Sequence, residues 1–256
     1  MNAAIKQETN TQAPSTRTAS KWMLLLLSGA CAITACKGVD PRVTAAAQQA
    51  AKEQAAAPLL QQYEAAVSKQ NWELARANAD FLLLDHAGTQ AAAKARTNYD
   101  EIKSKADALR DTRRLAGLWN YDSVSVKGGM QKSAAIYARD EIDVDGSGEK
   151  PVRLIFRDHP DWGRSAYLVL EAGDFRCPGG CRVPVKVDDD APKAMAATRP
   201  DTDEAIAMFI EDERALWRML KDSKLVAIEF PVKAGGTRTA QFEVGGLDRG
   251  QLPGWN

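Results

Sequence analysis

The 256-residue chain contains only two histidines and four cysteines, so it offers little material for a histidine-rich metal centre or a histidine general base. It also lacks a charge excess, because 34 Lys and Arg residues balance 34 Asp and Glu residues. Nucleic-acid-binding proteins normally carry a basic excess or stripe, so this balance argues against a nucleic-acid partner. Long apolar runs are equally scarce. The single run, near the N-terminus, excludes a multi-spanning membrane protein.

The apolar run covers residues 22–30, follows a polar lead with basic residues and is followed by small residues. It is much shorter than the ~20 apolar residues of a spanning helix, which is typical of an export signal. The segment then ends in Ile33-Thr34-Ala35-Cys36, a branched apolar residue and two small residues before a cysteine. This motif resembles the lipobox of bacterial lipoproteins, whose cysteine becomes the lipidated N-terminus. The resemblance implies a signal peptide over residues 1–35 and lipidation at Cys36.

Two alternatives to this interpretation remain open. Cys31 also follows small residues, but it lacks the branched residue three positions earlier. An ordinary cleaved signal or a single anchor helix would make Cys36 incidental.

Lipidation would hold the chain on a membrane, since acyl chains contribute ~0.8 kcal/mol of binding free energy per buried CH₂. Lys37 replaces the aspartate that retains enteric-type lipoproteins at the inner membrane, so the resemblance implies the periplasmic face of the outer membrane.

Residues 36–43 are predicted to form a short tether, and residues 44–115 an α-helical region. The segment 44–57 is dominated by Ala with Gln, Lys and Glu, a strongly helix-forming composition. Pro58 suits the first position of a second helix, where its missing N–H costs nothing. The composition therefore predicts two consecutive helices that meet at Pro58.

Two further helices are predicted from capping residues. Asn71 is the expected N-cap of a helix over residues 72–85. Gly88 suits the C′ position, and Thr89 the N-cap of the next helix. That helix has apolar residues at alternating steps of three and four, which predicts a coiled-coil-like seam. The seam consists of Ala92, Ala95, Tyr99, Ile102, Ala106 and Leu109.

The first helices also carry a recognisable pattern. Tyr63-Glu64-Ala65-Ala66, Trp72-Glu73-Leu74-Ala75 and Leu84-Asp85-His86 together resemble one tetratricopeptide-type (TPR-like) helical hairpin. The turn glycine is missing, and His86 stands where the proline ends such a repeat. No second copy follows at the period of 34 residues, so a repeat array is excluded. The alternative is a generic antiparallel helical hairpin, and either form implies a surface for peptides or proteins.

Residues 117–256 are predicted to form an antiparallel β-rich domain with one packed helix, which makes the fold class α+β. A helix is expected over residues 201–220, with Asp201 and Glu204 in capping-box spacing. Pro184 is expected to place its strand at an edge of the sheet. The predicted strands cover residues 118–126, 134–139, 152–157, 166–170, 182–187, 225–232 and 239–244.

Cys177 and Cys181 enclose Pro178-Gly179-Gly180 between two predicted strands. In an oxidising periplasm they are expected to form a disulfide that closes a tight hairpin. The spacing differs from the Cys-x-x-Cys of redox proteins, and neither histidine lies nearby to complete a zinc site. Free thiols are the alternative. No metal and no cofactor are predicted.

Acidic residues supply two weaker candidates for a metal site. Asp143, Asp145 and Ser147 alternate as in the start of a calcium loop, but position twelve is Leu154 rather than the required Glu. Residues 188–190 are three consecutive aspartates that suit either a divalent cation or a solvated strand end. We expect a polar turn at the first and a solvated strand end at the second.

Catalysis has little support in the sequence. His159 follows Asp158, but residues adjacent in sequence rarely form a catalytic pair, and no G-x-S-x-G nucleophile motif is present. A glycan hydrolase would rely on Asp158, Asp161 and Asp188, because paired carboxylates suffice for that chemistry. No catalytic residue is therefore assigned, and such a hydrolase stays an alternative.

The tryptophans Trp119, Trp162 and Trp255 fall near predicted strand ends or the C-terminus. They suit anchors for a partner protein or a glycan, or ordinary packing at the margin of a core. The β half also resembles small periplasmic accessory proteins of bacterial secretion systems. The features that carry this resemblance are the single helix predicted over residues 201–220 and the segments 154–157, 185–188 and 242–247.

These observations predict a non-enzymatic, membrane-anchored envelope lipoprotein that acts as a protein-interaction or accessory module in the periplasm. Its expected partners are the membrane, through Cys36, and another envelope protein. The alternatives are a cell-wall glycan-binding or hydrolytic protein and a periplasmic immunity or inhibitor protein.

Overall fold

The computed structural model describes residues 41–200 and 206–255. The predicted signal peptide, Cys31 and Cys36 lie outside these residues. Apart from the first residues of the first helix, the described residues belong to one compact unit, Ala47–Asn256. In the described part, helices come first and an antiparallel sheet follows, which confirms the α+β class. None of the helices described is both long and apolar enough to cross a membrane.

The helical segment contains four helices. Two predicted N-caps are confirmed: the Asn71 side chain accepts the Leu74 N–H at 3.3 Å, and Thr89 Oγ1 accepts the Ala92 N–H at 3.1 Å. Both bonds satisfy backbone donors that the first helical turn leaves free. The helices are α1 (Pro41–Ser68), α2 (Trp72–Asp85), α3 (Gln90–Thr97) and α4 (Tyr99–Ala116).

Two predictions about these helices are wrong. Pro58 does not begin a second helix but lies inside α1, which also starts within the predicted tether. Burial of Ala56, Tyr63 and Ala66 on both sides of the proline explains this, because tertiary packing contributes more to helix stability than one backbone bond. The continuous helix after Thr89 is also broken, at Asn98, a residue type that favours caps over helix interiors.

The helices have a core of their own, made largely of alanine side chains that allow close approach. Side-chain contacts from Glu73, Arg76 and Asp80 on α2 reach Arg113, Asp107 and Tyr99 on α4. The core consists of Ala56, Tyr63, Ala66, Ala75, Ala79, Leu82, Ala91, Ala95 and Ile102.

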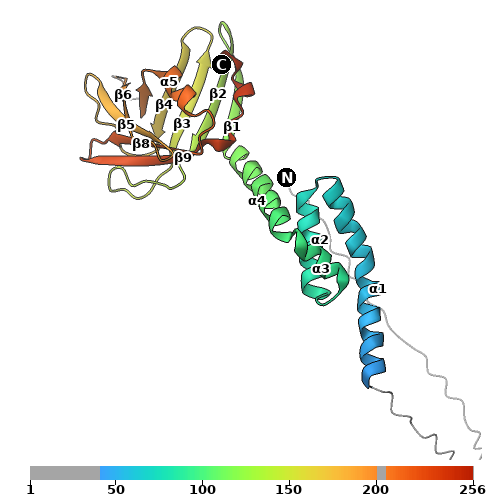
Figure 1. The fold of residues 1–256 in the computed structure, drawn as a ribbon. Helices are drawn as coiled ribbons and strands as arrows, with labels where there is room; N and C mark the ends of the chain where they lie inside the picture. Colours follow the sequence, from blue (N-terminus) through green and yellow to red (C-terminus); the bar gives the residue numbers. More distant parts are fainter. Residues whose placement is uncertain (1–40, 201–205, 256) are drawn as a thin grey trace, which may run out of the picture. The chain divides into compact units, whose positions relative to one another are not determined.

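The described strands form one nine-stranded sheet in which all neighbours are antiparallel. Its order is β1-β2-β3-β4-β7-β6-β5-β8-β9 (Figure 1). The strands are β1 (Trp119–Val126), β2 (Gly129–Tyr137), β3 (Val152–His159), β4 (Gly163–Leu170), β5 (Cys181–Val187), β6 (Lys193–Thr198), β7 (Ala207–Ile210), β8 (Leu225–Pro231) and β9 (Thr237–Glu243).

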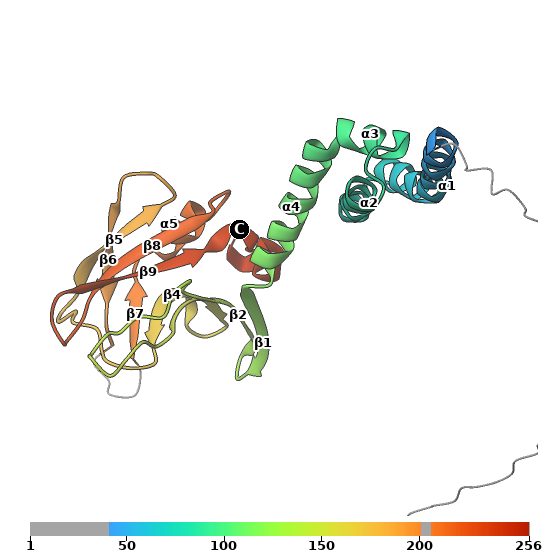
Figure 2. The same ribbon diagram turned by 90° about the horizontal axis from the view of Figure 1, so that it is seen from below.

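The sheet curves around a single core (Figures 1 and 2). Buried residues alternate along the strands, as on β3 at Leu154 and Phe156 and on β8 at Ile228, and all belong to one cluster. The Arg139 N–H donates to the Gln241 carbonyl at 2.7 Å, which joins the segment after β2 to β9. Alternate side chains therefore face inwards, and the others form an outer face.

An aromatic cluster lies at the centre of this core. The Phe156 ring centroid is 5.1 Å from that of Trp217, 5.4 Å from that of Trp255 and 6.3 Å from that of Trp119. Trp119 and Trp255 are each 5% exposed, so they are core residues and not anchors for a partner. Of the three tryptophans singled out in the sequence, only Trp162 is exposed.

The helix predicted over residues 201–220 is wrong over most of its length. Ala207–Ile210 is strand β7, and the helix α5 covers only Glu213–Met219. Its N-cap is Asp212, which accepts the Ala215 N–H at 2.9 Å, whereas Asp201 and Glu204 lie outside the described residues. Pairing with β4 on one side and β6 on the other overrides the helical spacing of these apolar residues.

Strand β5 is not at an edge, so the prediction for Pro184 is wrong as well. β5 lies between β6 and β8, but its pairing with β8 covers only Val185–Val187 and stops short of the proline. At Pro184, β5 therefore pairs only with β6, so the missing N–H of the proline costs no hydrogen bond to β8. Strand β6 was not predicted, because its Ala-rich sequence has low intrinsic strand preference.

Candidate functional site

The outer face of β3, β4 and β7 carries a row of large side chains. Ile155 lies opposite Tyr167 in the register of β3 and β4, and Tyr167 lies opposite Phe209 in that of β4 and β7. The rings of Tyr167 and Phe209 are 4.9 Å apart, and all three side chains are half-buried. Helix α5 packs on the opposite face, since its Leu216 and Trp217 belong to the core.

Two arginines flank this row on β3. The Arg157 Cζ lies 5.4 Å from the ring centroids of both Trp162 and Tyr167, and the Arg153 Cζ lies 5.7 Å from that of Tyr137. Neither Nε–H has a hydrogen-bond partner in the described part of the chain. The aromatic rings therefore orient the two guanidinium groups, and the buried Nε–H of each is left without a partner among the described residues.

Trp162 stands out in the turn between β3 and β4, with 71% of its surface exposed. His159 holds it there: its Nδ1 accepts the N–H groups of Asp161 at 3.1 Å and Trp162 at 3.3 Å. The His159 ring also stacks on the Trp162 ring, with centroids 4.0 Å apart and planes 14° apart. His159 is therefore a buried residue that stabilises the turn.

The exposed and half-buried side chains described above form one surface, which we call the aromatic–arginine face. It consists of Arg153, Ile155, Arg157, Trp162, Tyr167 and Phe209.

The three acids considered for glycan hydrolysis are not brought together. Asp158 and Asp161 lie at the β3–β4 turn, whereas Asp188 follows β5, and strands β4, β7 and β6 lie between β3 and β5. Asp188 instead accepts the N–H groups of Lys224 at 3.0 Å and Leu225 at 2.8 Å, where β8 begins. Its carboxylate thus caps a strand.

The calcium-like loop also uses its carboxylates internally. Asp143 accepts the Gly146 N–H at 2.7 Å, and Asp145 accepts the Ser147 N–H at 3.0 Å. Hydrogen bonds from Ser147 hold the pKa of Asp145 below its ordinary value. Across residues 41–200 and 206–255, no group of three His, Cys, Asp or Glu side chains is arranged to hold a metal ion.

Cys177 and Cys181 are bonded in a disulfide, with their Cα atoms 5.2 Å apart. The bond does not close a hairpin, because the strands on either side of the loop, β4 and β5, are not neighbours in the sheet. It closes instead a small ring at the start of β5. The expectation of a disulfide is therefore confirmed, and the expectation of a hairpin is wrong.

Replacing both cysteines with serine is expected to lower the free energy of unfolding by no more than ~2 kcal/mol, the loop-entropy value for so short a ring. The turn-forming sequence Pro178-Gly179-Gly180 already restricts the unfolded chain, which reduces the effect further. Urea unfolding of the double variant beside the wild type measures this. Complete unfolding at room temperature would show that the bond holds the whole domain together.

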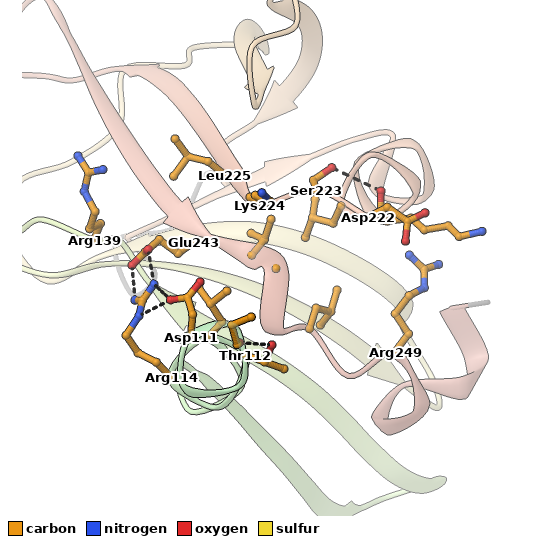
Figure 3. Close-up of a pocket in the computed structure, with 17 residues that line it drawn as sticks. Asp111, Thr112, Arg114, Arg139, Asp222, Ser223, Lys224, Leu225, Glu243 and Arg249 are labelled. Atoms are coloured by element: carbon orange, nitrogen blue, oxygen red, sulfur yellow. Dashed lines mark hydrogen bonds and ion pairs between the residues drawn. The ribbon is translucent and has the colours of Figure 1, made fainter. Parts of the chain in front are cut away.

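A groove of about 790 Å³ lies between the C-terminal turns of α4, the start of β8, the end of β9 and the short helix η1 (Val244–Gly246) (Figure 3). Arg114 donates to both Glu243 carboxylate oxygens at 2.9 Å and to Asp111 at 3.0 Å. These bonds raise the pKa of Arg114 and lower that of Glu243. The ion pair between Arg114 and Glu243 thus joins α4 to strand β9 of the sheet.

The sequence indicates Trp162 as a candidate binding residue but gives no such indication for the side chains beside it. Arg153, Ile155 and Arg157 alternate with buried residues of β3, so a two-residue period was the available signal. Tyr167 and Phe209 join them only through strand pairing. The groove had no signal in the sequence, because Arg114 and Glu243 are 129 residues apart.

Comparison of the chain with protein-family models, with curated proteins and with solved structures finds no match. The resemblances to lipobox lipoproteins, to a TPR-like hairpin and to secretion accessory proteins therefore stay predictions from short motifs.

Proposed function

We propose that this chain is a non-enzymatic lipoprotein of the bacterial cell envelope that binds another protein through the aromatic–arginine face. The observation that carries the proposal is the exposed Trp162 ring, 71% accessible, beside Arg157 and Tyr167. Trp, Tyr and Arg are the residue types that dominate the energetics of protein interfaces.

The arrangement of these side chains supports tight binding. Binding normally costs side-chain entropy, and this cost is lower where the side chains are already held in place. Trp162 is held by the stack on His159, and Arg157 lies against two rings. A complementary partner would offer an apolar pocket to Trp162 and a carboxylate to Arg157, since guanidinium groups bind carboxylates through paired hydrogen bonds.

Replacing Trp162 with alanine is expected to weaken the partner complex at least tenfold, because truncating a central aromatic anchor commonly costs about 2 kcal/mol or more. Crosslinking in living cells, with quantification of each crosslinked complex, measures the change. Leu84→Ala is the matched control. It also removes an exposed apolar side chain, since Leu84 is 79% exposed, but Leu84 lies on α2 and so outside the aromatic–arginine face. Unchanged yields of every complex with Trp162→Ala would refute a role for this face.

A glycan-binding protein is the second candidate, because exposed tryptophan rings such as Trp162 also bind sugars by stacking. Co-sedimentation with purified peptidoglycan distinguishes the two functions. Loss of sedimentation with Trp162→Ala, together with unchanged crosslinked complexes, would favour the glycan over the protein partner.

The membrane attachment is proposed to be a lipid on Cys36, supported by the lipobox-like sequence Ile33-Thr34-Ala35-Cys36. Cys36→Ser is expected to abolish acylation and leave the protein uncleaved in the inner membrane or soluble in the periplasm. Metabolic labelling with a clickable fatty acid measures this, and Cys31→Ser, which should keep the label, is the control. Label on the Cys36→Ser variant would place the modified cysteine elsewhere.

A further inference from the structure

The hydrogen bonds of His159 require that one of its ring nitrogens carries no proton. Its Nδ1 accepts the N–H groups of Asp161 at 3.1 Å and Trp162 at 3.3 Å. Both donors are backbone groups, whose direction is fixed by the planar peptide bond and which can only donate. A proton on Nδ1 would turn that nitrogen into a donor as well. The ring therefore keeps these two bonds only while Nδ1 is unprotonated.

The same two bonds fix the position of Trp162. They close the turn after β3, and the His159 ring, which is 6% exposed, stacks on the Trp162 ring with centroids 4.0 Å apart. Trp162 itself is 71% exposed, so most of its surface contacts no protein atom among the described residues. Loss of the two bonds would release the backbone that carries this side chain.

We propose that partner binding at the aromatic–arginine face depends on pH through His159. With Nδ1 unprotonated, His159 positions Trp162 for the partner. With Nδ1 protonated, the turn loses both bonds, Trp162 is no longer held, and the complex weakens. Histidine suits this role because its side chain ordinarily changes charge between about pH 5 and pH 8. Only the binding step rests on the proposed function, and the change in the turn does not.

The charged side chains on the neighbouring strands do not compensate for the lost bonds. Arg157, two residues earlier on the same face of β3, carries the charge that a protonated ring would have, and its Cζ lies 5.4 Å from the Trp162 ring centroid. Asp158 lies on the opposite face, where its register partners are Lys132 on β2 and Arg164 on β4. A protonated ring would therefore face a like charge along β3.

The acidic residue of the turn itself is Asp161. Its carboxylate lies against the turn between β1 and β2, because a β-carbon on Gly128 would stand 2.6 Å from its Oδ1. Lys127, the basic residue of that turn, is exposed. His159 forms no ion pair within 4.0 Å across residues 41–200 and 206–255. In this arrangement, protonation of Nδ1 removes two hydrogen bonds and adds no ion pair.

The test is an NMR titration of the purified full-length chain from about pH 8 to about pH 5, the range in which histidine ordinarily titrates. Long-range proton–nitrogen spectra of the imidazole rings show when Nδ1 of His159 takes up a proton. The backbone amide signals of Asp161 and Trp162 are expected to shift with the same midpoint. Protection of both amides from hydrogen exchange, relative to an unstructured chain, is expected to fall at least about fivefold, since each N–H loses its acceptor.

His159→Asn separates the proton from the hydrogen bonds. The side-chain carbonyl oxygen of asparagine accepts N–H groups slightly further along the chain, as Nδ1 does here, but it does not titrate. The amide signals of Asp161 and Trp162 should therefore stay constant in this variant. His86→Asn is the matched control, because it removes the other of the two histidines, at the end of α2, and should leave the pH dependence intact.

Photo-crosslinking in cells at the two pH values measures the effect on binding. Complexes that depend on Trp162 should decrease several-fold at the lower pH in the wild type and in His86→Asn, but not in His159→Asn.

Three results would each overturn the inference. The His159 ring could stay neutral down to about pH 5, the two amide signals could stay unchanged while Nδ1 takes up its proton, or His159→Asn could show the pH dependence of the wild type. The titration needs no partner. Amide signals that shift as expected, in a chain that forms no Trp162-dependent complex, would therefore refute the proposed function and leave the change in the turn established.

Discussion

Replacing Phe156 with alanine is expected to lower the free energy of unfolding by about 3–5 kcal/mol, the usual cost of removing a fully buried aromatic side chain. Phe156 is completely buried and lies at the centre of a cluster with Trp119, Trp217 and Trp255. Its loss would remove apolar burial and leave a cavity that three large, rigid rings cannot fill. Urea unfolding followed by tryptophan fluorescence measures the change directly, since all three tryptophans report on the site.

Phe81→Ala is the matched control for this variant. It removes the same side chain from α2, where Phe81 is 56% exposed, and should change stability much less. Equal losses in the two variants would contradict the placement of the core. A large loss with Phe156→Ala alone would establish that the aromatic cluster holds the curved sheet together.

Gly246→Ala is expected to destabilise the chain by about 2 kcal/mol or more, at the upper end of the range for overpacked sites. A β-carbon at this position would overlap the carbonyl group of Leu115 and the backbone nitrogen of Ala116 at the end of α4. Backbone atoms cannot rotate away as a side chain can. The substitution must therefore separate η1 from the end of α4, where Arg114 binds Glu243.

Its neighbour Gly245 provides the control. A β-carbon there would meet the Ser223 carbonyl oxygen at 3.4 Å and a Leu115 methyl group at 3.5 Å, so Gly245→Ala should cost less than about 1 kcal/mol. Thermal unfolding of both variants compares the two costs. Equal melting temperatures for Gly246→Ala and the wild type would show that α4 and η1 do not approach each other this closely in solution.

Features that depend on neighbours along the chain can be predicted without the structure. Asn71 and Thr89 cap helices because a short polar side chain reaches the N–H groups of the next turn wherever the chain enters a helix. Residues 152–157 indicated a strand, because β-branched and aromatic side chains favour the extended backbone, and the structure places a strand there. The helices-then-strands order of the α+β fold followed from such local signals.

Features that depend on distant partners became visible only in the folded chain. Residues 207–210 form a strand because β4 and β6 offer hydrogen bonds on both sides, although their apolar spacing also suits a helix. Trp119 is buried because Phe156 lies beside it, while Trp162 is exposed because its turn leaves the sheet. The physical reason is the same in each case: strand pairing and burial join residues far apart in sequence, and local preferences carry no information about those partners.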